Sequence, residues 1–497
     1  MISAAKIRRF DTRDGFELVD FAEVGLPVFR LTVEAVTLQK TSMPTIEEFV
    51  LRSIEAGERK AEGISRLLGL SEVVVRDGLD TLAYDELVAI SEDDLDAADR
   101  TYNITDLGKE LLTQGTRVYR DETLVFDYDG LRRRPIRLGK ESLLRATELS
   151  DMQAFQIRPY PVDAPPVEEI ALNQVVPAVR RISDRPFERT LLAIRRIVRR
   201  QTLFRQAVGL VYRGIESNDY QVGFAIGDTL SQEHEMVFAR HGGVKKPGFI
   251  RVQSYTDAMG AISHRLGAAL WNSLADRQTV SQLQREITGA LDEYSVLLAK
   301  MGRPKRRPKP EDQTRPDPAR VEQRLTELRL KLDRQGLRLG SPYELRELLN
   351  EALDKAERRL LITSRTVDAK AAPKGVIKKI TDRLSDGVNI RIETSLELNV
   401  NPKGKAGAFE PAVQLCLEAQ QRVGFSLAHT PDENELFFLI KDDDLAIVSN
   451  HPFLNEPRQK CFTPRAAVVT RVPQQVREIA SLAGLKDVSP VFLRKKK

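Results

Sequence analysis

The sequence predicts a multidomain protein of the mixed α/β class, and three observations support this. Its 497 residues exceed what one hydrophobic core usually holds, and correspond to about three domains. Residues 301–318 contain five prolines and many charges but no apolar residue after Met301, as is typical of a linker. From Ser341 onwards, stretches with helical spacing alternate with short strand-like apolar runs.

Composition excludes several classes of protein. Two cysteines, Cys416 and Cys461, are too few for a disulfide scaffold or a multi-cysteine zinc site. The first twenty residues lack the apolar stretch of a signal peptide, and no run approaches the length that spans a bilayer. No phosphate-binding G-x-x-x-x-G-K-[ST] motif occurs. We therefore expect a reduced, cytoplasmic protein without cofactor, metal or membrane partner.

Residues 45–112 predict three short helices, a hairpin and a closing helix. Thr45 and Glu48 have capping-box spacing, Gly69 ends the second helix, and Ser71 can cap the third. The segment T-D-L-G-K-E-L-L, residues 105–112, predicts the closing helix. This order, together with the T-x-x-G-x-x-L pattern, resembles bacterial winged helix-turn-helix domains.

The charge of this segment opposes the DNA binding that such a resemblance implies. Residues 45–100 contain six basic and fifteen acidic residues, a net charge of −9, and the third helix offers only Arg76. Phosphate neutralisation requires the opposite sign. We expect this segment to dock onto a protein partner. DNA contact through an unusual face, or a structural module with an acidic surface, are the alternatives.

Positive charge is concentrated further along the chain. Residues 180–205 carry nine arginines against Asp184 and Glu188, a net charge of +7. We interpret 174–206 as a basic helix and expect it to follow a nucleic-acid backbone, preferably of DNA, because arginine binds phosphate bidentately. The alternatives are pairing with the acidic segment of the same chain and an anionic membrane surface. The predicted nucleic-acid contacts are Arg185, Arg189, Arg195, Arg196, Arg199 and Arg200.

After Ser341, three helix–strand pairs precede two strands that predict a hairpin across the turn Lys441-Asp442-Asp443-Asp444. This order and the hairpin resemble the phospholipase D-like superfamily, whose signature is H-x-K-x4-D followed by G-S-x-N. Aligned on the acidic turn, Asp442 takes the place of the family aspartate, and Ser449 and Asn450 take the place of the G-S pair.

The two groups that perform the family's chemistry are replaced. The resemblance implies a histidine nucleophile where Glu435 stands and a lysine where Phe437 stands. A carboxylate repels a phosphodiester and Phe437 carries no charge, so the pattern disfavours catalysis. A shifted alignment or assembly with an active partner would leave phosphodiesterase activity open. Members with a single motif often dimerise, so the resemblance also implies a homodimer.

The chain is thus predicted to combine a winged helix, a mixed α/β middle domain and a phospholipase D-like α/β domain. The expected segments are an N-terminal strand and loop (1–41), an acidic winged helix (42–118), an arginine-rich mixed α/β domain (119–300), a basic proline-rich linker (301–318), an amphipathic helix (319–340), a phospholipase D-like domain (341–490) and a basic tail (491–497).

Three functions are compatible with this organisation. The first is a non-enzymatic, DNA-associated adaptor that recruits a protein partner, as an accessory subunit of a bacterial DNA-processing or anti-phage defence system. The second is a phospholipase D-like nuclease or phosphodiesterase. The third is a winged-helix transcriptional regulator with a ligand-sensing C-terminal domain.

Overall fold

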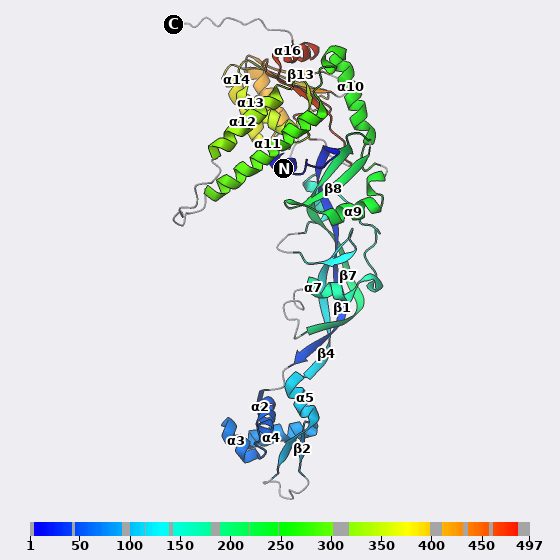
Figure 1. Cartoon of the computed structure of the whole chain (residues 1–497), viewed down its shortest axis with the longest axis vertical. Coiled ribbons are helices and arrows are strands. Elements are labelled where there is room, and N and C mark those ends of the chain that lie inside the picture. The colour runs from blue at the N-terminus through cyan, green and yellow to red at the C-terminus, as the bar shows by residue number, and fades with distance from the viewer. Residues whose placement is uncertain are drawn as a thin grey trace. The chain divides into compact units, whose positions relative to one another are not determined.

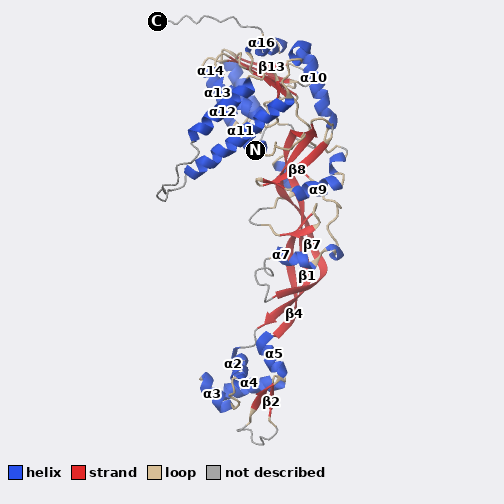
Figure 2. Ribbon diagram, viewed as in Figure 1, coloured by secondary structure: helices blue, strands red, loops and turns tan. Residues whose placement is uncertain are grey.

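The computed structural model describes most of the chain and divides it into two compact units. The first unit comprises residues 1–25, 146–157 and 206–497, and the second comprises 26–145 and 158–205. Figure 1 labels the elements along the chain, and Figure 2 distinguishes helices from strands. The described residues are 4–41, 45–91, 100–114, 116–138, 143–179, 189–217, 219–246, 248–301, 318–397, 410–430, 436–456 and 461–485.

Within the second unit, residues 45–114 have the predicted element order. The elements are α2 (Thr45–Glu55), α3 (Ala61–Leu68), α4 (Glu72–Tyr84), β2 (Val88–Ile90), β3 (Tyr102–Ile104) and α5 (Asp106–Gln114). Val50, Ile64 and Leu79 are fully buried and belong to one small core. We call residues 45–114 the three-helix segment, after the three helices that precede its hairpin.

The pattern T-x-x-G at the start of α5 has a structural reason. The Thr105 hydroxyl donates to the Leu87 carbonyl at 3.0 Å and accepts the Gly108 amide at 3.1 Å. A Cβ at Gly108 would lie only 2.3 Å from the Leu87 carbonyl oxygen. Glycine is therefore required for the closing helix to pack against the backbone directly before the first hairpin strand, β2.

Long antiparallel strands form the first large sheet. Its strand order is β5-β4-β1-β7-β8-β9, with β6 paired to β1. Strands β1 and β7 each contribute residues to both units. The strands are β1 (Phe16–Thr41), β4 (Thr116–Asp129), β5 (Arg134–Ile136), β6 (Phe155–Gln156), β7 (Arg189–Gly214), β8 (Tyr220–Ile226) and β9 (Thr229–Leu230).

The predicted basic helix over 174–206 is wrong. Only α7 (Leu172–Ala178) is helical among the described residues of this range, and the arginines from Arg189 onwards lie on strand β7. This stretch is rich in β-branched residues, including Ile194, Ile197 and Val198, which favour a strand. Arg195 and Arg199, like Arg196 and Arg200, are four residues apart and therefore imitate a helical face.

The second large sheet lies in the first unit and has the order β10-β16-β15-β14-β11-β12-β13. Strands β11, β12 and β13 run parallel, whereas β14, β15 and β16 are antiparallel to their neighbours. The strands are β10 (Arg338–Leu339), β11 (Arg359–Ser364), β12 (Asn389–Thr394), β13 (Phe425–His429), β14 (Phe437–Lys441), β15 (Leu445–Ser449) and β16 (Ala467–Thr470).

Helices cover this sheet. One core joins apolar side chains of alternate strand positions, such as Phe437 and Leu439, to those of α13 (Glu344–Lys355), α14 (Lys374–Ser385) and α15 (Pro411–Gln421). Helices α10 (Val252–Trp271) and α16 (Pro473–Leu482) contact β15. Figure 2 shows α13 and α14 beside the C-terminal strands.

The predicted amphipathic helix after the linker is present as α12 (Pro318–Asp333). Val321, Leu325, Leu328 and Leu332 are buried, and they pack against α11 (Arg277–Met301). The shorter helices are α1 (Ala4–Arg8), α6 (Ala146–Asp151) and α9 (Gln232–Arg240), with 3-10 turns at Val167–Glu169 and Gly243–Lys245. The linker residues 302–317 and the tail 491–497 lie outside the described residues. The chain is thus a mixed α/β protein with several sheets.

Candidate functional site

The hairpin predicted across the acidic turn is present. Strands β14 and β15 pair antiparallel, with Phe437 opposite Ser449. All five residues of each strand are buried. The hairpin is therefore a central part of the sheet, and its side chains serve packing.

Asp442 occupies the turn of this hairpin with a left-handed φ of 49°. Its carboxylate accepts the backbone N–H groups of Glu357, Arg358 and Arg359 at 3.0, 2.8 and 2.9 Å. Arg359 is the first residue of β11, and the other two residues directly precede it. Asp442 thus fixes one strand to the turn of its neighbour.

The remaining motif positions are also occupied by structural contacts. Phe437 is 3% exposed within the C-terminal core. The buried Ser449 hydroxyl accepts the His451 amide at 3.0 Å. The Asn450 side chain donates to the Pro464 carbonyl and accepts the Ala466 amide. Glu435 lies outside the described residues.

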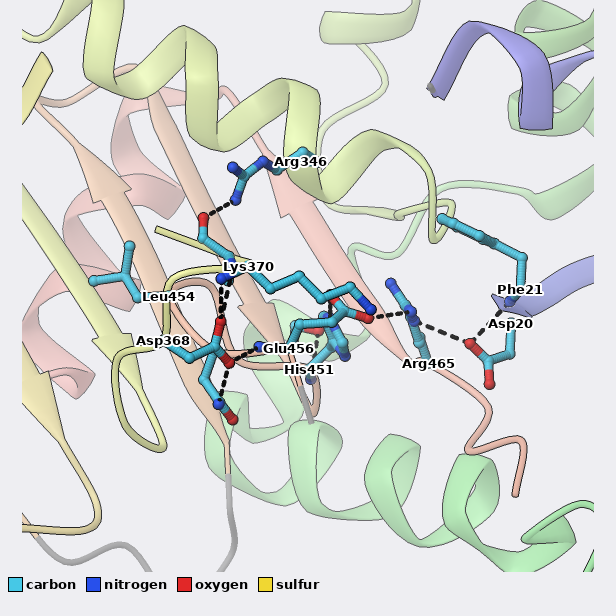
Figure 3. Close-up of polar contacts among 12 residues, drawn as sticks. Asp20, Phe21, Arg346, Asp368, Lys370, His451, Leu454, Glu456 and Arg465 are labelled. Carbon is cyan, nitrogen blue, oxygen red and sulfur yellow. Dashed lines mark hydrogen bonds and ion pairs between the residues drawn. The ribbon is translucent and has the colours of Figure 1, made fainter. Parts of the chain in front are cut away.

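A polar cluster that the sequence analysis did not predict lies directly after β15. It joins Asp20 of β1, Asp368, His451, Glu456 and Arg465, as Figure 3 shows. The Asp368 carboxylate accepts four hydrogen bonds. Three come from the backbone amides of Lys370, Ala371 and Glu456, and the fourth comes from the side-chain amide of Asn455. Its carboxylate thereby shapes the loop that carries Glu456.

Arg465 is the centre of this cluster. Its Nε donates to Asp20 Oδ1 at 3.0 Å, and its Nη2 donates to Glu456 Oε1 at 3.3 Å. The Asp20 and Arg465 side chains are 0% and 8% exposed. Removal of one partner of such a buried ion pair lowers the free energy of unfolding by about 3–5 kcal/mol. The pair therefore attaches β1 to the segment before β16.

Burial and Arg465 set the charges around this centre. Burial lowers the pKa of His451, and the neighbouring Arg465 cation adds to the lowering, so the imidazole is neutral at pH 7. Burial opposes ionisation of Glu456, but Arg465 and His451 outweigh it and hold the pKa of Glu456 well below its usual range. The Glu456 carboxylate lies 3.6 Å from His451 Nε2.

A cavity of about 110 Å³ adjoins this cluster. Residues of β1, α13, the Lys370–Ala371 turn and the loop after β15 line it. Arg346 of α13 enters this lining and donates to the Ala371 carbonyl. Burial lowers the pKa of the Arg346 guanidinium. The cavity thus combines an apolar wall with a cation.

The predicted nucleic-acid contacts that the structure describes share strand β7. Arg195 pairs with Asp121 at 3.0 Å, and Arg196 pairs with Glu34 at 2.6 Å. Arg199 and Arg200 are exposed and form no ion pair with any described residue. Arg189 begins the strand, and Arg185 lies outside the described residues. The partners are strand residues of β4 and β1, not the acidic three-helix segment.

A groove in the same unit gathers further arginines. It has a volume of about 490 Å³, and no carboxylate is among the described residues that line it. Arg205 on β7 is five residues from Arg200, a distance of about 17 Å along a strand. The lining arginines are Arg132, Arg134, Arg137 and Arg205. Three of these four, Arg132, Arg134 and Arg137, lie on or beside the short strand β5.

The three-helix segment pairs its few cations internally. Arg52, Arg66 and Arg76 each contact the glutamate four residues earlier in the same helix. Arg76, the one basic residue of α4, is held by Glu72. The segment also exposes large apolar side chains: Ile46, Phe49, Leu67, Val73, Tyr84 and Leu107.

The described residues show neither a metal centre nor a membrane-spanning helix. They contain no group of three or more histidine, cysteine, aspartate or glutamate side chains arranged to hold a metal ion. None of the described helices has the length and apolar character needed to cross a membrane.

Comparison with known proteins identifies similar solved structures. Neither a family model nor a curated protein sequence matches the chain. The phospholipase D family member Nuc from Salmonella typhimurium is 16% identical, with a TM-score of 0.22, over 29% of this chain and 89% of Nuc. NucT from Helicobacter pylori is 13% identical, with a TM-score of 0.21, over 30% of this chain and 92% of NucT. TrmBL2, an archaeal chromatin protein, is 17% identical, with a TM-score of 0.21, over 33% of this chain and 57% of TrmBL2.

Proposed function

We propose that this chain is a non-enzymatic, nucleic-acid-associated adaptor. Exposed arginines of β7 would hold a phosphate backbone, preferably of DNA. The observation that carries the proposal is that Arg199 and Arg200 are exposed cations without an ion pair in the described chain. The arginine-lined groove around Arg205 adds further positive charge on the same strand. Such contacts position a protein on nucleic acid without reading its sequence.

The hairpin supports a pseudoenzyme rather than a phospholipase D-like nuclease. Phe437 offers no charge for a phosphate, and the Asp442 carboxylate is occupied by three amides. A nucleophile and a cation would both have to come from elsewhere. The adaptor therefore needs an active partner for any cleavage.

The acidic three-helix segment, which we interpret as a winged helix, is proposed to recruit that partner. Its third helix presents no unpaired cation among the described residues, because Arg76 is bound by Glu72. Exposed Phe49 and Tyr84 offer apolar contacts of the kind that protein interfaces use. We infer a basic protein partner for this surface.

The wider setting is an accessory role in a bacterial, cytoplasmic DNA-processing or anti-phage defence system, with a homodimer as a further assembly. The second candidate is a transcriptional regulator with a ligand-sensing C-terminal domain. The cavity beside Arg346 favours this candidate. Specific operator binding that changes little with salt would support the regulator over the adaptor.

The test is binding of the full chain to labelled duplex and single-stranded DNA over a salt series. We expect the double variant Arg199→Glu/Arg200→Glu to weaken binding and to lower the slope of log K against log salt by about 2. The reason is that each lost phosphate contact removes about 0.9 from the slope.

A matched control separates a local site from overall charge. Arg320→Glu/Arg329→Glu makes the same charge change on exposed positions of α12. We expect this variant to bind like wild type. Equal weakening by both double variants, or wild-type binding by the β7 variant, would contradict the proposed site.

A further inference from the structure

The cavity beside the polar cluster combines two chemically different ends in one compact unit. Its apolar side is formed by Leu345 and Leu349 of α13 and by Phe453 after β15. Its polar side holds Arg346, and the adjacent wall includes Glu456 and Arg465. Figure 3 shows Arg346 descending from its helix towards the loop that contains Lys370.

Arg346 is an incompletely satisfied cation. A guanidinium has five N–H donors, and within the described residues Arg346 uses one nitrogen for the Ala371 carbonyl and forms no ion pair. Arg465, by contrast, has two carboxylate partners, Asp20 and Glu456. Burial lowers the pKa of Arg346, and the nearby carboxylates of Glu456 and Asp368 offset this effect only in part. An anionic oxygen at this end would complete its hydrogen bonding.

The charge of the wall limits the ligand to a monoanion. Three cations (Arg346, Lys370 and Arg465) and two carboxylates (Glu23 and Glu456) line the cavity, so its wall carries one net positive charge. One net positive charge suits one carboxylate better than a dianionic phosphate.

The size and the apolar wall define the rest of the ligand. An apolar cavity of about 150 Å³ holds benzene, so about 110 Å³ suits a chain of roughly four carbons. We propose that this cavity binds a short organic monocarboxylate, with its carboxylate on Arg346 and its hydrocarbon chain against Leu345, Leu349 and Phe453. This inference does not depend on nucleic-acid binding by β7.

The experiment is ligand-observed saturation-transfer NMR with the full chain and four probes: acetate, butyrate, butylamine and inorganic phosphate. We expect saturation of butyrate, weaker saturation of acetate and none of butylamine. Arg346→Gln should weaken butyrate binding at least tenfold, whereas Arg477→Gln, an exposed arginine of α16, should leave it unchanged. Phosphate, observed by 31P line broadening, should not bind.

A second variant keeps the inference testable if Arg346→Gln does not fold. Leu349→Phe adds volume at the apolar wall and should exclude butyrate while the circular dichroism spectrum stays that of wild type. Butyrate binding that survives either folded variant would overturn the inference. So would the absence of butyrate binding to wild type, or displacement of butyrate by phosphate.

Discussion

Asp442 lies in the hairpin turn with a positive φ of 49°, a conformation that aspartate tolerates better than most residues. Its carboxylate accepts hydrogen bonds from three successive backbone amides, the last of which begins β11. A residue at a motif position is therefore used to join two strands.

Replacement of Asp442 should reduce stability. We expect Asp442→Ala to lower the free energy of unfolding by about 3 kcal/mol, because three amides lose their acceptor. Urea denaturation measures the change. Asp386→Ala, which removes an exposed partner of Arg383, should change it by less than about 1 kcal/mol. Wild-type stability of Asp442→Ala would show that the carboxylate is dispensable.

His451 makes the C-terminal part sensitive to acid. Its folded-state pKa lies below the ordinary value of 6.5, chiefly because it is buried. The folded chain then binds fewer protons than the unfolded chain below pH 6.5. Its contribution to stability is complete above pH 6.5 and is lost as the pH falls from there.

Denaturation at pH 7.5 and 5.5 tests this sign. We expect His451 to reduce stability between these values, with a slope of at most about 1.4 kcal/mol per pH unit. Asp11 and Asp20, whose pKa burial raises to about 6, contribute with the opposite sign, so the difference between wild type and His451→Gln measures the histidine. His451→Gln should be more stable at pH 5.5, relative to pH 7.5, than wild type, and a variant of the exposed His264, His264→Gln, should behave like wild type. Identical pH dependence in wild type and His451→Gln would refute the assignment.

At the scale of elements, strand β7 carries buried apolar side chains and exposed arginines at different positions. Leu191 is 6% exposed and belongs to a core that includes Leu31 and Phe126 of the neighbouring strands β1 and β4. Arg195 lies on the same strand, exposed, in a pair with Asp121. The exposed arginines of β7 can therefore contact a ligand without disturbing the core that the strand shares with β1 and β4.

Two substitutions in β7 should behave differently. We expect Leu191→Ala to lower the free energy of unfolding by about 3 kcal/mol, as buried leucines do. Arg195→Gln should leave the melting temperature unchanged, because an exposed ion pair contributes little. Thermal denaturation followed by circular dichroism compares the two, and a loss in Arg195→Gln as large as that in Leu191→Ala would contradict this division.

At the scale of the whole molecule, each compact unit has its own hydrophobic core. Leu79 is fully buried in the three-helix segment of the second unit, and Leu353 is fully buried in the C-terminal core of the first. Chains with separate cores commonly unfold in more than one step.

Calorimetry of two core variants should resolve these steps. We expect Leu79→Ala to lower one thermal transition and Leu353→Ala to lower a different one, each by an amount that corresponds to about 2–5 kcal/mol. A single transition that shifts equally in both variants would show that the cores unfold together.

Local patterns in the sequence predicted many elements correctly. Leucines of α12 at intervals of three and four residues, the glycine after α3 and the acidic turn of the β14–β15 hairpin each depend on neighbours within a few residues. Helical periodicity and turn chemistry act over this range. The mixed α/β class could therefore be predicted from the sequence.

The candidate site was predicted less well. The motif positions Asp442, Ser449 and Asn450 were placed on the correct hairpin, but their contacts were not foreseen. No motif marks the cluster of His451, Glu456 and Arg465, although His451 directly follows Ser449-Asn450 in the sequence.

The sequence by itself determined the charge segregation, the hairpin, and the glutamate and phenylalanine at positions 435 and 437, because these are properties of residue identity and near neighbours. Only the tertiary structure decided that the arginines lie on a strand, since β7 depends on pairing within a sheet whose strands are distant in sequence. Only the tertiary structure brought Asp20 to Arg465, across 445 positions, and formed the cavity beside Arg346. Burial and long-range pairing decide such contacts, and no local pattern encodes them.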